Sequence, residues 1–130
     1  MKFDLHEASP GCVVLTCQGG LSWEDRELLA ATVEQCLAGR STLRGLVLDM
    51  TGVEFVNSTG LGALFQLVQR LRSRGGQLAF AAVPPTIRRL FATVGMERLA
   101  KLADSVAEAL DMLAQPPEAT DTGSGPPPST

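Results

Sequence analysis

The sequence predicts an α/β fold, in which a mixed and mostly parallel sheet is combined with about four helices in the order ββαβαβαβα. Two observations support this fold class. Apolar segments of strand length alternate with segments in which apolar residues recur at helical spacing. Strands that alternate with helices need crossover connections, and these connections favour parallel pairing. The chain has 130 residues, which is enough for one hydrophobic core and too few for two domains of ordinary size.

The first third of the chain predicts a hairpin and then a helix. Phe3 and Leu5 alternate with polar residues, residues 8–11 form a turn cluster, and residues 12–17 are mostly apolar. A helix is expected to begin at Ser22, whose hydroxyl can accept a hydrogen bond from a backbone N–H in the first turn. Its apolar stripe ends before Gly39, and glycine suits the left-handed end of a helix.

The middle of the chain predicts a buried strand and the clearest helix. Residues 46–48 are apolar without alternation, which is typical of a covered strand, and this strand is expected to end at Asp49. A loop is expected over residues 51–57. The next helix is expected to begin at Ser58 and to end at Gly75-Gly76, and we expect Phe65 on its apolar stripe to lie in the core. The stripe consists of Leu61, Leu64, Phe65, Val68 and Leu71.

The last third predicts two more strands and two more helices. Residues 77–83 form an apolar strand, and Pro84-Pro85 favours the start of a third helix that ends at Gly95. A short strand over residues 99–102 and a helix over residues 104–114 complete a domain of residues 1–114. Residues 115–130 hold five prolines and no large apolar side chain, which predicts a disordered tail.

The charge distribution is uneven. The net charge is −3, so the chain as a whole lacks the basic excess that nucleic acid or an anionic membrane would attract. Residues 70–101 nevertheless hold seven Lys or Arg residues and one acidic residue. This basic band could bind an acidic partner or a phosphate, or its arginines could complement the C-terminal end of a helix.

Residues for catalysis or metal binding are scarce. His6 is the one histidine, so a catalytic triad or a two-histidine metal site has little to be built from. Cys12, Cys17 and Cys36 lack metal-site spacing, and we expect buried thiols in a reducing compartment. No apolar stretch has the length of a signal peptide or a membrane span. We therefore expect a cytoplasmic protein that is not an enzyme and uses no metal or cofactor.

One segment, residues 49–62, combines features of a binding site. Asp49 is expected at the end of a strand, and Asn57 and Ser58 follow at the start of a helix. A helix N-terminus offers free backbone N–H groups and partial positive charge, which suit a phosphate. The alternative is that Asn57 or Ser58 only caps the helix. Gly60 and Gly62 do not complete a nucleotide-binding fingerprint, and we expect them to let helix and sheet approach closely.

At this segment the sequence resembles the STAS family, specifically its bacterial anti-sigma-factor antagonists. The resemblance extends beyond the segment and covers about residues 3–114. The matching marks are residues 46–49, 53–55 and 58–62, Gly75-Gly76, residues 84–91 with Gly95, and Ala109-Leu110. The resemblance implies phosphorylation of Ser58 by a partner kinase, with Thr59 as the second choice. It implies a partner surface supported by Asp49 and Glu54. That surface would consist of Asn57, Ser58, Thr59, Gly60 and Leu61.

The resemblance also implies a function. The chain would bind an anti-sigma factor of the histidine-kinase-like serine kinase type and release it when Ser58 is phosphorylated. The chain departs from the family pattern at Asn57, where the family usually has aspartate, so a carboxylate beside the acceptor hydroxyl is replaced by a neutral amide. The alternative is a constitutive STAS subunit of a lipid-transport ATPase or a signalling scaffold, in which Ser58 would be a cap.

Overall fold

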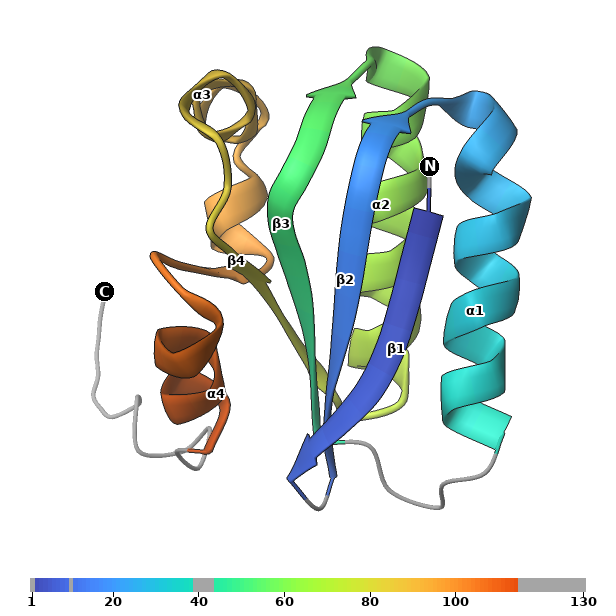
Figure 1. Ribbon diagram of the computed structural model, residues 1–130, viewed down its shortest axis with the longest axis vertical. Coiled ribbons are helices and arrows are strands. Elements are labelled where there is room, and N and C mark those ends of the chain that lie inside the picture. The colour runs from blue at the N-terminus through green and yellow to red at the C-terminus, as the bar shows by residue number, and fades with distance from the viewer. Residues whose placement is uncertain (1, 10, 39–43, 115–130) are drawn as a thin grey trace.

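The protein forms one five-stranded sheet in a computed structural model that describes residues 2–9, 11–38 and 44–114 (Figure 1). The strands lie in the order β1 (Lys2–Ser9), β2 (Cys12–Leu21), β3 (Gly45–Val56), β4 (Gln77–Ala81) and β5 (Lys101–Ala103). β1 pairs with β2 antiparallel, and every later pair is parallel. The predicted hairpin and the mixed, mostly parallel sheet are therefore confirmed.

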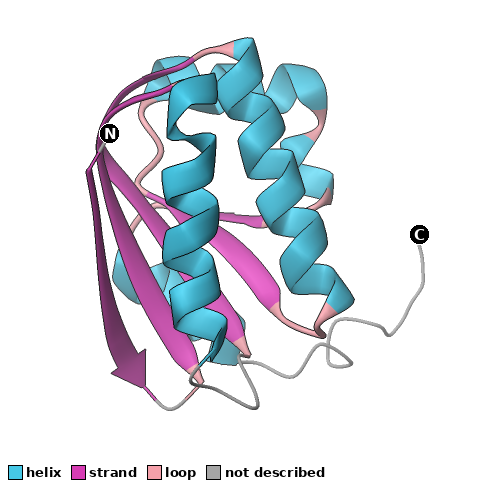
Figure 2. Ribbon diagram, turned by 90° about the vertical axis from the view of Figure 1, so that its right-hand side faces the viewer, coloured by secondary structure: helices cyan, strands magenta, loops and turns pink. Residues whose placement is uncertain are grey.

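Among the described residues, four α-helices cover the two faces of the sheet. They are α1 (Arg26–Ala38), α2 (Ser58–Ser73), α3 (Pro85–Val94) and α4 (Val106–Ala114), and the 3-10 turns η1 (Trp23–Asp25) and η2 (Met96–Arg98) precede α1 and follow α3. Helices α1 and α2 lie side by side on one face (Figure 2). Helix α4 packs on the other face, against a smaller cluster that includes Val14, Val47 and Ala79. The element order ββαβαβαβα is confirmed.

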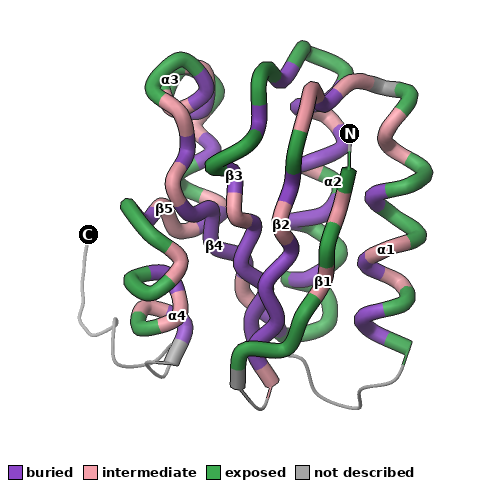
Figure 3. Tube along the Cα trace, viewed as in Figure 1, coloured by how far each residue is buried: buried purple, intermediate pink, exposed green. Residues whose placement is uncertain are grey.

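The core lies between the sheet and its helices (Figure 3). Its largest fully buried side chains include Phe80 and Phe91, whose ring centroids lie 4.8 Å apart. The three cysteines are buried free thiols, as expected. Burial, with a smaller contribution from the negative charge of Asp49, raises the pKa of Cys17 to about 12. That thiol therefore stays protonated and unreactive at neutral pH.

The expected loop over residues 51–57 is wrong, because the chain continues as strand. β3 runs without interruption from Gly45 to Val56. β2 is also longer than predicted, and it pairs with this second half of β3 after two register shifts. In the same way Asp49 lies inside the strand and not at its end. Buried and exposed residues do not alternate over residues 51–56. The alternation that usually indicates a half-buried strand is therefore absent, and the sequence did not predict a strand there.

Phe65 is a second correction. Leu64, Val68 and Leu71 are buried as predicted, but Phe65 is only half-buried and packs at the margin of the core. The buried arc of α2 instead extends over Ala63 and Leu67, because α1 packs beside α2 and covers that side. The periodicity identified the helix, and a neighbouring helix decided which side of it is buried.

The helix ends follow the predicted residues with one difference. Gly75 and Gly95 adopt positive φ after α2 and α3, which glycine permits at low cost. At the start of α1, however, the Ser22 hydroxyl donates to Oδ2 of Asp25 at 3.2 Å, and the Ser22 N–H donates to the same oxygen at 3.0 Å. The bond from this N–H is the main reason why the pKa of Asp25 is lowered. Gly39 and the expected tail, residues 115–130, lie outside the described residues.

Candidate functional site

The candidate site lies where β3 passes into α2, at the end of the sheet where the parallel strands finish (Figure 1). Asn57 is the N-cap of α2, with extended backbone angles. Its side-chain Oδ1 accepts hydrogen bonds from the Gly60 N–H and from the Thr59 hydroxyl, both at 2.8 Å. The capping role considered for Asn57 is thus real, and the amide oxygen orients the first turn of the helix.

Two backbone contacts fix this first turn against β2. The Asn57 N–H donates to the carbonyl oxygen of Leu21 at 3.2 Å. Gly60 lies against the same carbonyl, so closely that a Cβ atom on residue 60 would overlap the oxygen. Only glycine fits there, which confirms the expected close approach. Gly62 differs, because a Cβ at that position would meet nothing within 4 Å.

Ser58 and Thr59 are both exposed but differ in their hydrogen bonds. The Thr59 hydroxyl is held by Asn57. Within the part of the chain that the structure describes, neither the hydroxyl nor the backbone N–H of Ser58 has a hydrogen-bond partner. The Ser58 hydroxyl is therefore free to react, beside a free N–H at the positive end of the helix dipole.

The structure separates the other residues assigned to this site. Asp49 lies eight residues before Asn57 along an extended strand, on the order of 20 Å away. Its carboxylate accepts hydrogen bonds from the N–H and the hydroxyl of Thr51, at 3.1 and 2.7 Å. The structure therefore places Asp49 away from Asn57 and Ser58, with its carboxylate hydrogen-bonded to Thr51. Leu61 is 6% exposed and belongs to the core, whereas Glu54 is exposed on β3 near the site.

Phe55 is a surface feature that sequence reasoning missed. Its side chain is 52% exposed, and its ring lies directly against the backbone of Gly20, where any Cβ atom would overlap it. A groove of about 420 Å³ separates this end of β3 from α3 and is lined by Phe55, Val56, Ile87 and Leu90, with Glu54 and Arg89 among its polar residues. The predicted loop over residues 51–57 gave no neighbouring strand to Phe55, so its place on the surface was missed. The pair Gly19-Gly20 could have indicated it, because glycine leaves room for a large ring from an adjacent strand.

Two classes of site have no candidate in the described residues. Over residues 2–9, 11–38 and 44–114 there is no group of three or more His, Cys, Asp or Glu side chains that could hold a metal ion. No helix in these same segments is long and apolar enough to cross a membrane.

Several known proteins are similar to this chain in sequence or in fold. The anti-sigma F factor antagonist of Paenibacillus polymyxa is 22% identical over 103 residues, which are 79% of this chain and 87% of that protein. An anti-sigma factor antagonist from Mycobacterium paratuberculosis has a TM-score of 0.75 at 22% identity, covering 88% of this chain and 94% of its own. The phosphorylated form of the Bacillus cell fate determinant SpoIIAA has a TM-score of 0.67 at 20% identity, covering 86% of this chain and 99% of its own.

A family model also matches the chain. The model of the STAS domain matches residues 6–109, which is most of the chain and includes all five strands in whole or in part. The matched region contains the capped start of α2, the Gly60 contact with β2 and the exposed Ser58. The chain therefore belongs to the STAS domain family.

Proposed function

We propose that this protein is an anti-sigma-factor antagonist, a binding protein whose activity is switched by phosphorylation of Ser58. The observation that carries the proposal is the free Ser58 hydroxyl at the start of α2. Among the two neighbouring hydroxyls, that of Thr59 is already engaged by Asn57. The relative from P. polymyxa bears the name of such an antagonist, and a structural neighbour is known in unphosphorylated and phosphorylated forms.

The local geometry explains how such a switch can work without unfolding. A phosphate on Ser58 adds about −1.5 to −2 charges. It would stand at the positive end of the α2 dipole, which tolerates negative charge. The same charge would oppose a close, desolvated contact made by this surface. Release of the partner would therefore follow from local electrostatics.

The partner in this proposal is an anti-sigma factor of the histidine-kinase-like type, which also acts as the serine kinase. Asn57, Ser58 and Thr59 present their side chains to solvent. Gly60 and Leu61 are buried, and they contribute by placing the first turn of α2. The exposed ring of Phe55 and the groove beside α3 extend the surface with apolar area, which gives a partner an anchor.

Asn57 sets the expected rate of the switch. A neutral amide cannot take a proton from the acceptor hydroxyl as a carboxylate can, so we expect slow phosphotransfer and a largely unphosphorylated, binding-competent protein. Asn57→Asp should raise the rate of transfer. Single-turnover phosphorylation of the two forms by one kinase measures this, and an equal or slower rate for Asn57→Asp would show that the amide does not limit transfer.

The central test uses a purified anti-sigma kinase from the organism of origin, with ATP. We expect one phosphate on Ser58, located by mass spectrometry. Ser58→Ala should abolish phosphorylation and keep binding, and Ser58→Asp should weaken binding while keeping the fold. Thr59→Ala is the matched control and should still accept phosphate on Ser58. Phosphate on Thr59 or elsewhere in the wild-type chain would contradict the proposed switch.

A further inference from the structure

A second hollow lies at the other end of α2 from Ser58. It has a volume of about 430 Å³ and is bounded by the end of α2, the start of β4 and residues 97–101. Three cationic side chains line it, each from a different element: Arg72 from α2, Arg98 from η2 and Lys101 from β5. Glu97 is the one carboxylate among the lining residues. The hollow therefore concentrates positive charge in a chain whose net charge is −3.

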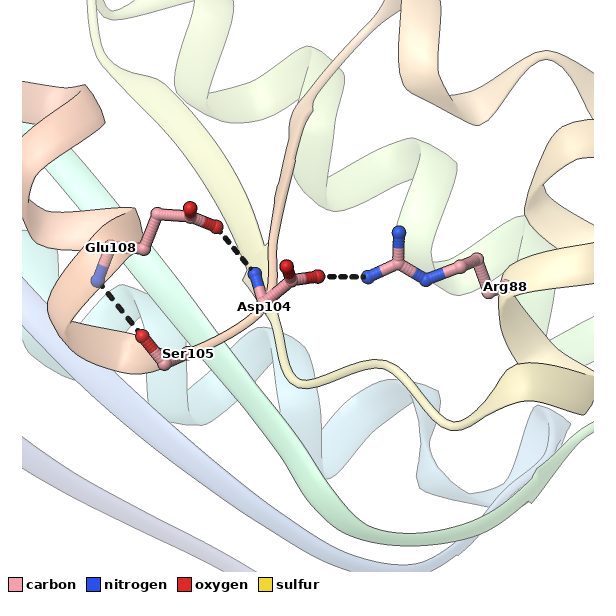
Figure 4. A network of polar contacts seen from close by, with 4 residues as sticks. All are labelled: Arg88, Asp104, Ser105 and Glu108. Atoms are coloured by element: carbon pink, nitrogen blue, oxygen red, sulfur yellow. Dashed lines mark hydrogen bonds and ion pairs between the residues drawn. The ribbon is translucent and has the colours of Figure 1, made fainter.

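These three cations converge on one hollow and, unlike Arg70 and Arg88 of the basic band, form no ion pair within the described residues. Arg70 forms an ion pair with Glu34. Arg88 forms one with Asp104 at 3.3 Å, next to the hydrogen bonds that Ser105 and Glu108 make at the start of α4 (Figure 4). Within the described segments, the side chains of Arg72, Arg98 and Lys101 make neither an ion pair nor a hydrogen bond.

The dipole of α2 explains only one of the three. Arg72 is in the last turn of α2, where a cation interacts favourably with the negative end of the helix. The carbonyl groups of Leu71 and Arg72 in that turn already accept hydrogen bonds from backbone N–H groups of residues 74–76. Arg98 ends a 3-10 helix of a single turn and Lys101 begins an edge strand, so neither has a helix dipole to complement. Their convergence with Arg72 needs another reason.

The shape and lining of the hollow indicate what kind of anion would fit it. Its volume is within the range of small-molecule sites, about 300–1,000 Å³. Leu78 and Ala100 are buried and Leu99 is half-buried, so apolar atoms lie beside the charged ones. A compact molecule with several negative charges and a small apolar part matches this lining better than an extended acidic peptide, which would need a longer groove.

We propose that this hollow binds a small soluble molecule that carries two or more phosphate groups, held by Arg72, Arg98 and Lys101. Arginine donates paired hydrogen bonds to phosphate oxygens, and lysine acts there as a point charge. Arg72 follows Asn57 by fifteen residues of helix, so the two sites are about 22 Å apart along α2. The proposal is independent of Ser58 and of the anti-sigma factor.

The test is titration of the full chain with pyrophosphate, followed by calorimetry and by backbone amide shifts in two-dimensional NMR. We expect saturable one-to-one binding, with the largest shifts in residues 75–78 and 97–101. Arg98→Ala and Lys101→Ala should each weaken binding by about tenfold or more, the value of one hydrogen bond to a charged group. Arg98→Lys should restore part of the affinity. Arg98 is exposed and Lys101 is partly buried, and both line the hollow. Thermal melts check that each variant folds.

Lys2→Gln is the matched control, because it removes one positive charge from an exposed position on β1 outside the hollow. It should leave pyrophosphate binding unchanged. An equal loss of affinity in Lys2→Gln and Arg98→Ala would show that pyrophosphate responds only to the net charge of the chain, and this would overturn the proposal. Three other results would also overturn it: no saturable binding, shifts confined to residues 57–60, and binding of a polyglutamate peptide at the hollow without binding of pyrophosphate. None of these results bears on phosphorylation of Ser58, so the two proposals fail separately.

Discussion

The two halves of β3 contrast more sharply than any two separate elements. From Gly45 to Asp49 the strand pairs with β2 on one side and β4 on the other, and Leu46, Val47 and Leu48 are almost fully buried. From Thr51 to Val56 it pairs with β2 alone, and most of its residues are exposed. Figures 1 and 3 show the second half extending beyond β4 towards the start of α2.

This contrast separates the part of the strand that stabilises the fold from the part that presents a surface. Substitutions in the first half remove buried area between two neighbouring strands and the helices. Substitutions in the second half change an exposed edge that leads directly to Ser58. We therefore expect stability and partner binding to respond to different halves of the same strand, and four predictions test that separation.

The largest expected effect is in the first half of β3. Leu48 is 1% exposed and pairs with Leu15 and Phe80 in the neighbouring strands. Leu48→Ala should lower the free energy of unfolding by about 2–5 kcal/mol, through lost burial and the cavity left behind. Urea unfolding followed by circular dichroism measures this value. A midpoint equal to that of the wild type would mean that the first half of β3 is not the centre of the core.

The next effect concerns the junction between β3 and α2. Gly60→Ala places a methyl group against the Leu21 carbonyl oxygen, a backbone atom that cannot turn aside. We expect a loss of roughly 1–3 kcal/mol, typical of overpacking. Gly62→Ala is the matched control, and it should be neutral or stabilise the helix by up to about 1 kcal/mol. If both variants unfold at the same denaturant concentration, the close contact between α2 and β2 is not rigid.

A smaller effect should follow removal of the α2 cap. Asn57→Ala deletes the oxygen that accepts from Gly60 and Thr59, and we expect a cost of about 1 kcal/mol. Asn57→Asp keeps an acceptor and places a negative charge at the helix N-terminus, so its stability should remain near that of the wild type. Thermal melts of the two variants, with Ser58→Ala as reference, compare them. A loss in Asn57→Asp as large as in Asn57→Ala would contradict the capping role.

The smallest effect on stability is expected at Phe55, in the second half of β3. Because the ring is 52% exposed, Phe55→Ala should cost about 1 kcal/mol or less. The same variant should weaken binding of the anti-sigma factor by about tenfold or more if the ring anchors the partner. Calorimetric titration with the partner gives the second quantity. If Phe55→Ala binds the anti-sigma factor with unchanged affinity, the partner contacts another surface. The two halves of β3 would then differ in their contribution to stability but not in partner binding.

The sequence by itself determined the element order, the parallel pairing and the start of α2. These depend on local signals: apolar runs of strand length, the periodic stripe from Leu61 to Leu71, and the residues that begin or end helices, namely Pro85, Gly75 and Gly95. Each signal acts within a few residues of the chain, so it can be recognised without knowing the neighbours in space. The cap of α2 belongs to this group only in part, because the sequence offered Asn57 or Ser58 as the cap and the structure shows that it is Asn57.

Only the tertiary structure decided which residues those elements bring together. Residues 51–56 become a strand because an extended β2 pairs with them through register shifts, and no local pattern records a partner so distant in the sequence. The same pairing moves Asp49 away from Asn57 and places the ring of Phe55 on Gly20. Packing of α1 beside α2 leaves Phe65 at the edge of the core. Arg72, Arg98 and Lys101 converge for a similar reason, because the crossover connections return three separate elements to one end of the sheet.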